Sequence, residues 1–288
     1  MSHFAIAGLQ LELQPGNNLP RIRAELERLR ARFPWVQMAV LGELCLFGAD
    51  TARAEPLPGR SEQELCAIAR DLGLWLVPGS LYEQAGGRVY NTAPVINPAG
   101  AVVARYRKMF PFLPYERGVE PGAEFVTFEV PGVGCFGVSI CYDMWFPETT
   151  RTLVCRGAEV ILHPTLTNTI DRDLELAIAR TNAAINQCYF FDINSAGILG
   201  YGRSIVVGPD GEVIHAAGTA HEIIPVEVDL ARLRRARSRG VLGLGQPLKS
   251  FRDSAERFAL YGDDAARRTH LDKLGPLDMP AAPGAAPC

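Results

Sequence analysis

The sequence predicts a single α/β domain in which β-sheets stack on one another. Apolar strand-like segments alternate with roughly four to five amphipathic helices, and several strands are joined by short glycine-containing turns typical of hairpins. No shift of composition divides the 288 residues into two domains. The many hairpins also argue against a doubly wound nucleotide-binding fold, in which helices connect parallel strands.

The N-terminal part of the chain is expected to alternate strands with two helices. Asn18 can cap the first helix, which has Pro20 in its first turn and an apolar stripe at helical spacing. A capping box, Ser61–Glu64, opens the second helix, which runs to about Asp71. The expected strands are Phe4–Leu11, Val36–Leu41, Leu74–Val77, Val89–Ile96 and Val102–Tyr106, with the third and fourth joined around Gly86 and Gly87.

The same alternation continues through the rest of the chain. Strands are expected at Phe125–Val130, Cys135–Ile140, Glu159–His163, Tyr189–Asn194, Ser204–Val207, Glu212–His215 and Ile223–Val228. Helices are expected at about Glu148–Arg156 and Asp173–Cys188, and Leu230–Arg237 is predicted to be the final helix.

Composition and charge exclude several classes of protein. A chain with 48% hydrophobic and 21% charged residues is an ordinary globular protein, and its net charge of -3 gives no attraction to nucleic acid or to an anionic membrane. Seven cysteines without a C-x-x-C pair indicate free thiols in a reducing compartment. No segment reaches the roughly 18 apolar residues of a membrane span, and Met1–Leu13 lacks the basic start of a signal peptide. We therefore expect a cytoplasmic protein.

Three patterns that could mark sites have simpler structural explanations. Gly132–Gly137 matches G-x-G-x-x-G, but a strand follows it where a dinucleotide site needs a helix. His163 ends an apolar strand, where a hydrogen-bonded structural histidine is the favoured interpretation. A helix face in solvent or between subunits is favoured over a phosphate-binding stripe for Arg232, Arg234, Arg235, Arg237 and Arg239.

Cys141 is the strongest candidate for a reactive group. It ends an apolar strand and precedes Pro147, which is well placed to start a helix. Backbone N–H groups are free at such a junction and stabilise a developing negative charge. The alternative is a buried structural thiol, the usual fate of cysteine, which we expect for the other six.

Two charged residues strengthen this interpretation. Glu43 follows a buried strand and is flanked by apolar residues on both sides, so burial is expected to raise its pKa toward that of a general base. Lys108 ends a later strand, and it is one of only three lysines among 29 basic residues. A surface basic cluster with Arg105 and Arg107 is the alternative, but the rarity of lysine indicates that a compact ammonium is needed there.

These residues, in this order and spacing, resemble the Glu-Lys-Cys signature of the nitrilase, or carbon–nitrogen hydrolase, superfamily. The similarity rests on Gly-Glu43, on Tyr-Arg-Lys108 leading to Pro-Tyr-Glu116, and on Ser-Ile-Cys141-Tyr-Asp with Pro-Glu148 after it. Further matches are Ala179-Arg180 with Asn186 and the Gly202–Gly211 hairpin, so that the resemblance covers about Phe4 to Leu230.

The resemblance implies a four-layer α-β-β-α sandwich and a thiol hydrolase without metal or organic cofactor. Glu43 is then the base, Lys108 the oxyanion stabiliser, Cys141 the nucleophile and Glu116 a second glutamate that positions the substrate and the lysine. In water, moving a proton from a cysteine to a glutamate costs about 5.7 kcal/mol, a gap that such a site must narrow. We expect Lys108 and the Tyr142 backbone N–H to favour the thiolate and the tetrahedral oxyanion.

The substrate expected from the resemblance is a small amide. Nitrilases typically follow the cysteine with Trp-Glu, whereas Tyr142-Asp143 resembles the amidase and carbamoylase branches. Carbamoyl amides and nitriles remain alternatives. Met144-Trp145 stands where the N-carbamoyl-D-amino-acid branch has an arginine pair, which argues against an amino-acid carbamoylase. The residues expected to line the pocket are Tyr115, Tyr142, Trp145, His163 and Asn168.

The remaining expectations concern organisation and the possibility of a silent scaffold. The hydrolase domain is placed at 1–230, followed by an extension at 231–274 that contacts a second subunit and a Pro/Ala-rich tail at 275–288. A homodimer or larger homo-oligomer is therefore expected, and a monomeric mass by light scattering would contradict it. A catalytically silent protein of the same fold is the non-enzyme alternative. In that case, no cysteine should react with iodoacetamide markedly faster than the others.

Overall fold

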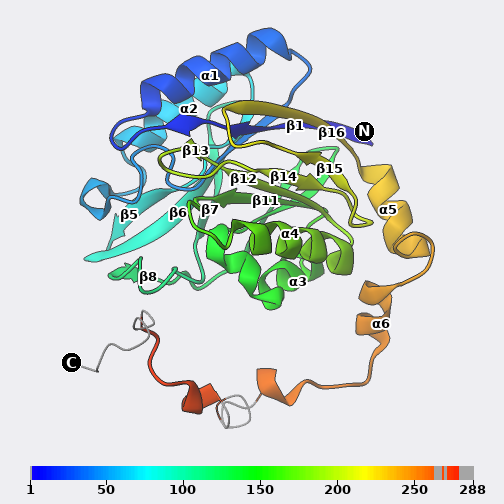
Figure 1. Cartoon of the computed structure of the whole chain (residues 1–288). Coiled ribbons are helices and arrows are strands. Elements are labelled where there is room, and N and C mark those ends of the chain that lie inside the picture. The colour runs from blue at the N-terminus through cyan, green and yellow to red at the C-terminus, as the bar shows by residue number, and fades with distance from the viewer. Residues whose placement is uncertain (1, 263–267, 269–270, 279–288) are drawn as a thin grey trace.

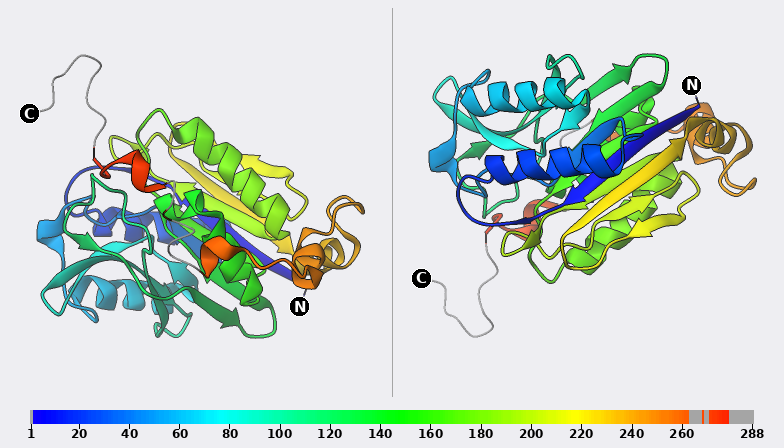
Figure 2. Two further views of the ribbon diagram at one scale, coloured as in Figure 1. Left: turned by 90° about the horizontal axis from the view of Figure 1, so that it is seen from below. Right: turned by 90° about the horizontal axis from the view of Figure 1, so that it is seen from above.

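The computed structural model describes residues 2–262, 268 and 271–278. Two large β-sheets pack face to face, and a pair of helices covers the outer face of each, as Figures 1 and 2 show. The prediction of an α/β domain with stacked sheets, in the form of an α-β-β-α sandwich, is confirmed.

The first sheet is assembled largely from the N-terminal half of the chain. Its strand order is β16-β1-β3-β4-β6-β5, and β7 and β8 also pair with β6. β1, β3 and β4 run parallel to one another, whereas β16 pairs antiparallel with β1 and β6 pairs antiparallel with β4. The strands are β1 (His3–Gln10), β3 (Met38–Leu41), β4 (Trp75–Val77), β5 (Leu81–Ala85), β6 (Arg88–Ile96), β7 (Val102–Arg107), β8 (Val119–Glu120) and β16 (Glu222–Asp229).

The second sheet comes from the middle and the later part of the chain. Its order is β15-β14-β12-β11-β10-β9, with β10, β11 and β12 parallel at its centre. The strands are β9 (Val126–Val130), β10 (Gly134–Val138), β11 (Val160–Thr165), β12 (Tyr189–Asn194), β14 (Ile205–Val207) and β15 (Val213–Ala216). A separate short pair joins β2 (Glu12–Leu13) to β13 (Ala196–Gly197).

The apolar contacts follow the four layers. One buried cluster lies between the two sheets and contains Phe4, Val40, Phe136 and Phe191. A second cluster joins the first sheet to helices α1 (Leu19–Arg32) and α2 (Arg60–Leu72), and a third joins the second sheet to α3 (Pro147–Cys155) and α4 (Arg172–Asn186). Burial of apolar surface on both faces of each sheet explains why the central strands are almost continuously apolar.

Two local expectations are wrong, and a third, the cap of the first helix, holds only in position. Ser61 lies inside α2, whose N-cap is Gly59, so the proposed capping box does not form; instead the Glu55 carboxylate accepts a hydrogen bond from the Ser61 backbone N–H. Asn18 does occupy the N-cap of α1, but its side chain bonds to the carbonyl oxygens of Gln14 and Cys45. The segment before the Gly86-Gly87 turn is a further strand, β5, which pairs antiparallel with β6.

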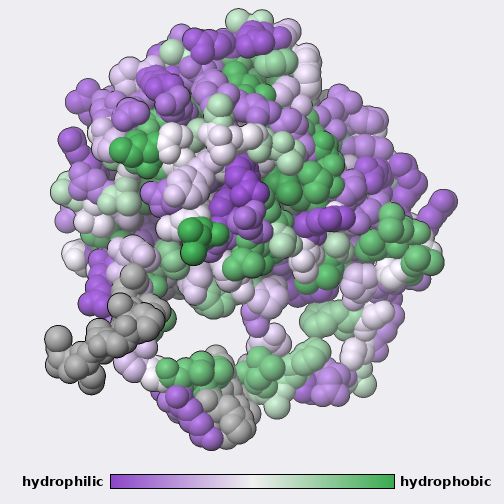
Figure 3. All heavy atoms as spheres, viewed as in Figure 1, coloured by the Kyte–Doolittle hydropathy of each residue, from purple (hydrophilic) through white to green (hydrophobic). Residues whose placement is uncertain are grey.

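The chain continues beyond the predicted final helix. α5 (Leu230–Arg239) packs onto the sandwich through Leu233 and Ala236, and α6 (Pro247–Asp253) follows it. Short 3-10 helices lie at Thr51–Arg53, Cys141–Trp145, Ala259–Tyr261 and Asp272–Leu274. Figures 1 and 3 show the segment after α5 extended along the outside of the molecule, with apolar side chains along it. Its exposed apolar residues include Leu242, Leu244, Phe251, Phe258, Leu260 and Tyr261.

The arginines of α5 have structural partners. Arg234 ion-pairs with Glu159 at 2.7 Å, and Arg237 donates to the carbonyl oxygens of Gln187 and Ala158. Arg234 and Arg237 therefore serve the fold of the chain itself, whereas the favoured expectation was a helix face in solvent or between subunits. The glycine-rich segment forms the turn between β9 and β10, as expected of a hairpin rather than a dinucleotide loop. Within the described residues, no helix is both long and apolar enough to cross a membrane.

Gly79 supports the turn that follows β3. It has φ +75°, and a methyl group on its Cα would overlap the carbonyl oxygen of Gly42. Gly73, which ends α2, has a similar φ of +62° but open space around its Cα. Gly79→Ala is therefore expected to lower the free energy of unfolding by at least about 2 kcal/mol, against about 1 kcal/mol for Gly73→Ala. Urea denaturation of both variants measures the difference, and equal losses would contradict a special role of the Gly42–Gly79 contact.

Candidate active site

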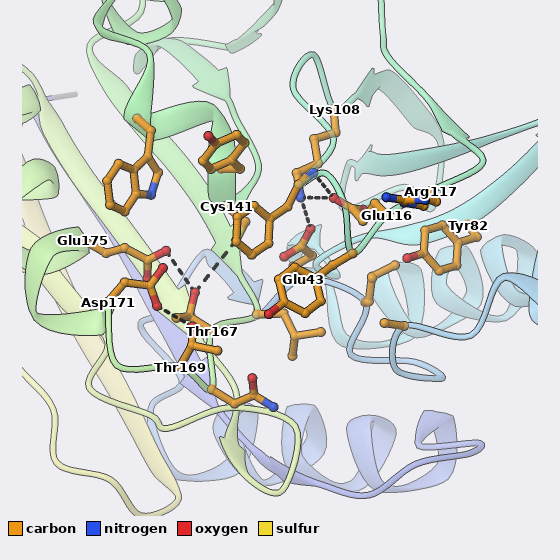
Figure 4. Close-up of a pocket in the computed structure, with 18 of the residues that line it drawn as sticks. Glu43, Tyr82, Lys108, Glu116, Arg117, Cys141, Thr167, Thr169, Asp171 and Glu175 are labelled. Carbon is orange, nitrogen blue, oxygen red and sulfur yellow. Dashed lines mark hydrogen bonds and ion pairs between the residues drawn. The ribbon is translucent and has the colours of Figure 1, made fainter. Parts of the chain in front are cut away.

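The candidate site is a cavity of about 330 Å³ at one end of the sandwich. Glu43, Lys108, Glu116 and Cys141 all line it, so the four residues singled out for chemistry come together in space (Figure 4). Glu43 follows β3 and Lys108 follows β7, while Cys141 lies three positions after the last residue of β10. Loops at strand ends carry each group, as is usual where a rigid sheet positions functional side chains.

Glu43 is held in a buried turn after β3. Its backbone N–H donates to the Thr165 carbonyl oxygen at 3.0 Å, which joins this turn to the second sheet. Its side chain is 3% exposed, and one carboxylate oxygen accepts from Lys108 Nζ at 2.8 Å. Burial raises the pKa of Glu43, although Lys108 works in the opposite direction. The expectation of a buried glutamate with a raised pKa is confirmed.

Lys108 forms the centre of a buried charge cluster. Its ammonium donates to Glu43 at 2.8 Å and to Glu116 at 2.6 Å. Burial alone would lower the pKa of Lys108, but the negative charges around it outweigh burial and raise its pKa well above the ordinary value. The pKa of Glu116 is lowered, because Lys108 outweighs the effect of burial. The alternative of a surface basic cluster is therefore wrong for Lys108, which is 1% exposed.

Asn91 belongs to the same cluster and was missed by the sequence analysis. It lies in β6, and its side-chain amide donates to Glu43 at 2.8 Å and to Glu116 at 3.0 Å. Its backbone carbonyl oxygen accepts from the Lys108 backbone N–H at 2.8 Å. One side chain thus fixes the spacing of the two carboxylates that flank the lysine. The signal for it was an amide within an otherwise buried apolar strand, because a buried polar group needs partners.

Cys141 lies in a strained backbone conformation at the start of a 3-10 helix. Its φ of +44° falls in the left-handed region, which costs a non-glycine residue roughly 1–2 kcal/mol. The strain turns the chain sharply after β10 and directs the sulfur into the cavity (Figure 4). Among the described cysteines, Cys141 alone lines the cavity, and the other five described ones are free thiols elsewhere. Cys288 lies outside the described residues.

Asp143 fixes the turn that carries Cys141. It is fully buried, and its carboxylate accepts from the backbone N–H groups of Ile140 at 2.8 Å and Phe110 at 2.9 Å and from the Tyr106 hydroxyl at 2.6 Å. Burial raises its pKa to about 6 despite these donors. The turn is thereby tied to the segment around Lys108, so the nucleophile candidate and the cation candidate cannot move independently.

The surroundings of Cys141 favour its thiol form, although Lys108 acts toward the thiolate as expected. Burial and the carboxylate of Glu43 raise the pKa of Cys141 well above its ordinary value, and the attraction of Lys108 does not compensate. The physical reason is that the ammonium is already shared between two carboxylates. The pKa values of Cys141 and Glu43 are thus both raised, so the site makes Glu43 a better proton acceptor without making the thiol easier to ionise.

The predicted pocket residues divide into two groups. Tyr115, Tyr142, Trp145 and Asn168 line the cavity, whereas His163 does not. His163 is fully buried in β11, where its Nδ1 lies 2.7 Å from the Ser139 hydroxyl and burial lowers its pKa to about 3. A hydrogen-bonded structural histidine was the favoured interpretation, and the structure agrees with it, whereas the expectation that His163 lines the pocket is wrong.

Two further cavity residues had no signal in the sequence analysis. Thr167 Oγ1 lies 3.9 Å from Cys141 Sγ and donates to a Glu175 carboxylate oxygen at 3.1 Å. Glu175 lies in α4 and also accepts from Arg172 at 2.9 Å. Figure 4 shows Thr167 and Glu175 beside Cys141, on the side away from Glu116. A lone Thr in a loop and a Glu within a helix are too common to stand out in one sequence.

A comparison with known protein families shows which family the chain belongs to. A sequence profile described as carbon–nitrogen hydrolase matches residues 5–238, most of the chain and all of the cavity described above. The chain belongs to the carbon–nitrogen hydrolase family. The predicted membership of the nitrilase superfamily is confirmed, and with it a hydrolase of carbon–nitrogen bonds.

Individual relatives agree with this assignment. Human omega-amidase NIT2 is 34% identical over 200 residues, which cover 64% of this chain and 72% of the relative. The crystal structure of Saccharomyces cerevisiae Nit3, a member of branch 10 of the nitrilase superfamily, has a TM-score of 0.76 at 29% identity and covers 82% of this chain and 94% of its own. A cysteine-to-alanine variant of the Nesterenkonia AN1 amidase, in complex with butyramide, has a TM-score of 0.72 at 26% identity, with 82% and 95% covered.

Proposed function

We propose that this carbon–nitrogen hydrolase cleaves small amides through a thioester on Cys141. The observation that carries the proposal is the buried cluster in which Lys108 bridges Glu43 and Glu116 beside Cys141. The likeness to a named omega-amidase and to an amidase solved with butyramide supports an amide as the substrate.

The first half of the reaction forms the thioester. Cys141 Sγ attacks the carbonyl carbon of the amide while its proton passes to Glu43, whose raised pKa suits it to accept one. The carbonyl oxygen becomes an oxyanion. Lys108 has three N–H donors, and two of them are directed at Glu43 and Glu116, so the third is left for this oxygen. The Tyr142 backbone N–H, in the first turn of its 3-10 helix, is the second expected donor.

The second half releases the products. Glu43 returns its proton to the nitrogen, the carbon–nitrogen bond breaks, and ammonia leaves. Water then enters, and Glu43 takes one of its protons while the hydroxide attacks the thioester carbon. Collapse of this second tetrahedral intermediate breaks the carbon–sulfur bond and releases the carboxylic acid. Glu43 gives its proton to the departing sulfur, which restores the thiol of Cys141 and the ionised glutamate.

The charges of the cavity favour a neutral substrate. Its lining contains two cations, Lys108 and Arg117. Lys108 is paired with two carboxylates, and Arg117, whose side chain is 70% exposed, ion-pairs with Asp278 at 3.3 Å. Asp171 and Glu175 add negative charge at the other end of the cavity. Both cations among the described lining residues are thus already paired. Binding a substrate carboxylate would be unfavourable, because no free cation would compensate its charge.

A panel of matched four-carbon compounds tests the proposal. Ammonia release is expected from butyramide, with a kcat/KM at least about tenfold above that of succinamate, because the latter places a carboxylate in an acidic cavity. Hydroxylamine should divert the reaction to the hydroxamate, as it does with a thioester intermediate. Butyronitrile and propylurea are the matched nitrile and carbamoyl compounds. Turnover of either one in the absence of amide turnover would contradict the proposed substrate class.

A further inference from the structure

Cys141 has polar neighbours on two sides, and the proposed reaction uses only one of them. Glu43 and Lys108 lie on the first side. On the second side, Thr167 Oγ1 lies 3.9 Å from the sulfur and is joined to Glu175 by a hydrogen bond of 3.1 Å (Figure 4). Thr167 is 5% exposed and Glu175 is 3% exposed, so this chain of contacts is shielded from bulk water.

The position of Thr167 is fixed independently of the sulfur. Its backbone N–H donates to the Asn194 side chain at 3.0 Å, and its carbonyl oxygen accepts from the same side chain at 2.9 Å. Glu175 is anchored through Arg172 at 2.9 Å, and Arg172 also ion-pairs with Asp192 at 2.9 Å. Both residues are therefore held rigidly, which a group that positions another side chain requires.

We propose that Thr167 and Glu175 are a positioning pair for Cys141, in which the protonation state of Glu175 decides whether the Thr167 hydroxyl accepts from the sulfur or donates to it. A threonine hydroxyl has a single hydrogen. When Glu175 is ionised it can only accept, so the hydroxyl gives its hydrogen to Glu175 and presents a lone pair to the Cys141 thiol. When Glu175 is protonated it can donate to Thr167, and the hydroxyl hydrogen is free for a Cys141 thiolate.

The surroundings place this exchange near neutral pH. Burial first, and then the negative charge of Asp192, raise the pKa of Glu175 to about 7, while Arg172 works in the opposite direction. Ionised Glu175 also contributes to the raised pKa of Cys141. At a pH below the pKa of Glu175, the Thr167–Glu175 pair therefore favours the Cys141 thiolate, and at a higher pH it disfavours the thiolate. The charged or titratable groups that face Glu175 are Arg172 and Asp171 at the start of α4, Asp192 on β12 and Cys141 itself.

The test measures alkylation of Cys141 by iodoacetamide between pH 5.5 and 9, followed by mass spectrometry of the Cys141 peptide. The exposed Cys155, in the same digest, is the internal reference. In the unmodified chain, the alkylation rate relative to that of Cys155 should change slope near pH 7. Glu175→Gln should remove this inflection and raise the rate at pH 8 by about tenfold, the size of one hydrogen bond to an ionised group.

Variants of Thr167 separate positioning from a purely structural role. Thr167→Ser keeps the hydroxyl, so Glu175→Gln should change the alkylation rate as much in this background as in the unmodified chain. In the Thr167→Val background, Glu175→Gln should change the logarithm of the rate by less than about half as much. An equal effect of Glu175→Gln in the valine and threonine backgrounds would overturn the pair. So would an unmodified chain whose rate shows no inflection between pH 6 and 8, a result that needs no variant to fold.

The inference rests on Cys141 being the nucleophile of the proposed reaction, but alkylation requires no substrate. A protein that shows the coupling and hydrolyses no amide would overturn the proposed function and leave the pair in place. A protein that hydrolyses butyramide and shows no coupling would do the reverse.

Discussion

Cys141→Ala is expected to reduce kcat for butyramide by at least about 10⁴-fold, because the covalent route needs the sulfur and no other side chain of the cavity can form the thioester. Ammonia release at saturating butyramide measures the loss of kcat. The variant should still fold, since the substitution removes one buried sulfur and no charge, and circular dichroism checks this.

Cys155→Ala is the matched control. Cys155 lies at the end of α3 and is exposed, so its replacement should leave turnover within about twofold of the unmodified protein. Hydroxamate formation should be absent in Cys141→Ala and present in Cys155→Ala. If Cys141→Ala kept more than a few per cent of the original turnover, the thioester mechanism would be wrong.

The residues at strand ends could be found from the sequence because local patterns reveal them. Glu43 and Cys141 each follow a buried apolar strand, and Lys108 stands out because lysine is rare in this chain. Glu116 lies in a loop and was assigned only through the family resemblance. The structure adds what holds these four together: Lys108 is bonded to both carboxylates, and Asp143 ties the cysteine turn to the segment that follows β7.

The residues that the sequence analysis missed have partners that are distant along the chain. Asn91 bonds to a residue 48 positions away, and Thr167 reaches Cys141 across 26 positions. Asn91 and Glu43 belong to the first sheet, and Thr167 and Cys141 follow strands of the second. Each contact arises only when strands that are distant in sequence assemble into a sheet, so neither periodicity nor a local motif predicts it. The capping box at Ser61 failed for a related reason, because Glu55, outside the helix, satisfies the backbone donor there.

The organisation of the C-terminal segment stays a prediction. The packed core continues past the expected boundary at residue 230 into α5, and the segment beyond it exposes apolar residues such as Phe251 and Phe258. Whether a second copy of the chain covers them is the question that a mass measurement answers. The part of the predicted tail at 279–288 lies outside the described residues.

Lys108→Met is expected to harm both stability and turnover. It leaves the buried carboxylates of Glu43 and Glu116 without their cation, which costs about 3–5 kcal/mol of the free energy of unfolding near pH 8. Loss of the oxyanion donor alone should lower kcat by about 10²–10³-fold. Urea denaturation and ammonia release measure the two effects separately.

The pH dependence of that destabilisation has a definite sign. In the unmodified protein the pKa of Glu116 is lowered, so its ionised form stabilises the fold above the ordinary glutamate pKa. Without Lys108, burial and mutual repulsion raise the pKa values of both carboxyls, and the folded state then binds more protons than the unfolded one. Stability of Lys108→Met should therefore fall as the pH rises from 5 to 8, so the loss relative to the unmodified protein is greatest at pH 8.

Lys108→Arg separates charge from geometry. A guanidinium keeps the positive charge between Glu43 and Glu116, so most of the stability should return and its fall with rising pH should disappear. Turnover should stay at least about tenfold low, because the planar group cannot direct two donors at the carboxylates and a third at the oxyanion from one nitrogen. An arginine variant with normal kcat would remove Lys108 from the oxyanion site, and the cluster would then serve to hold Glu43 alone.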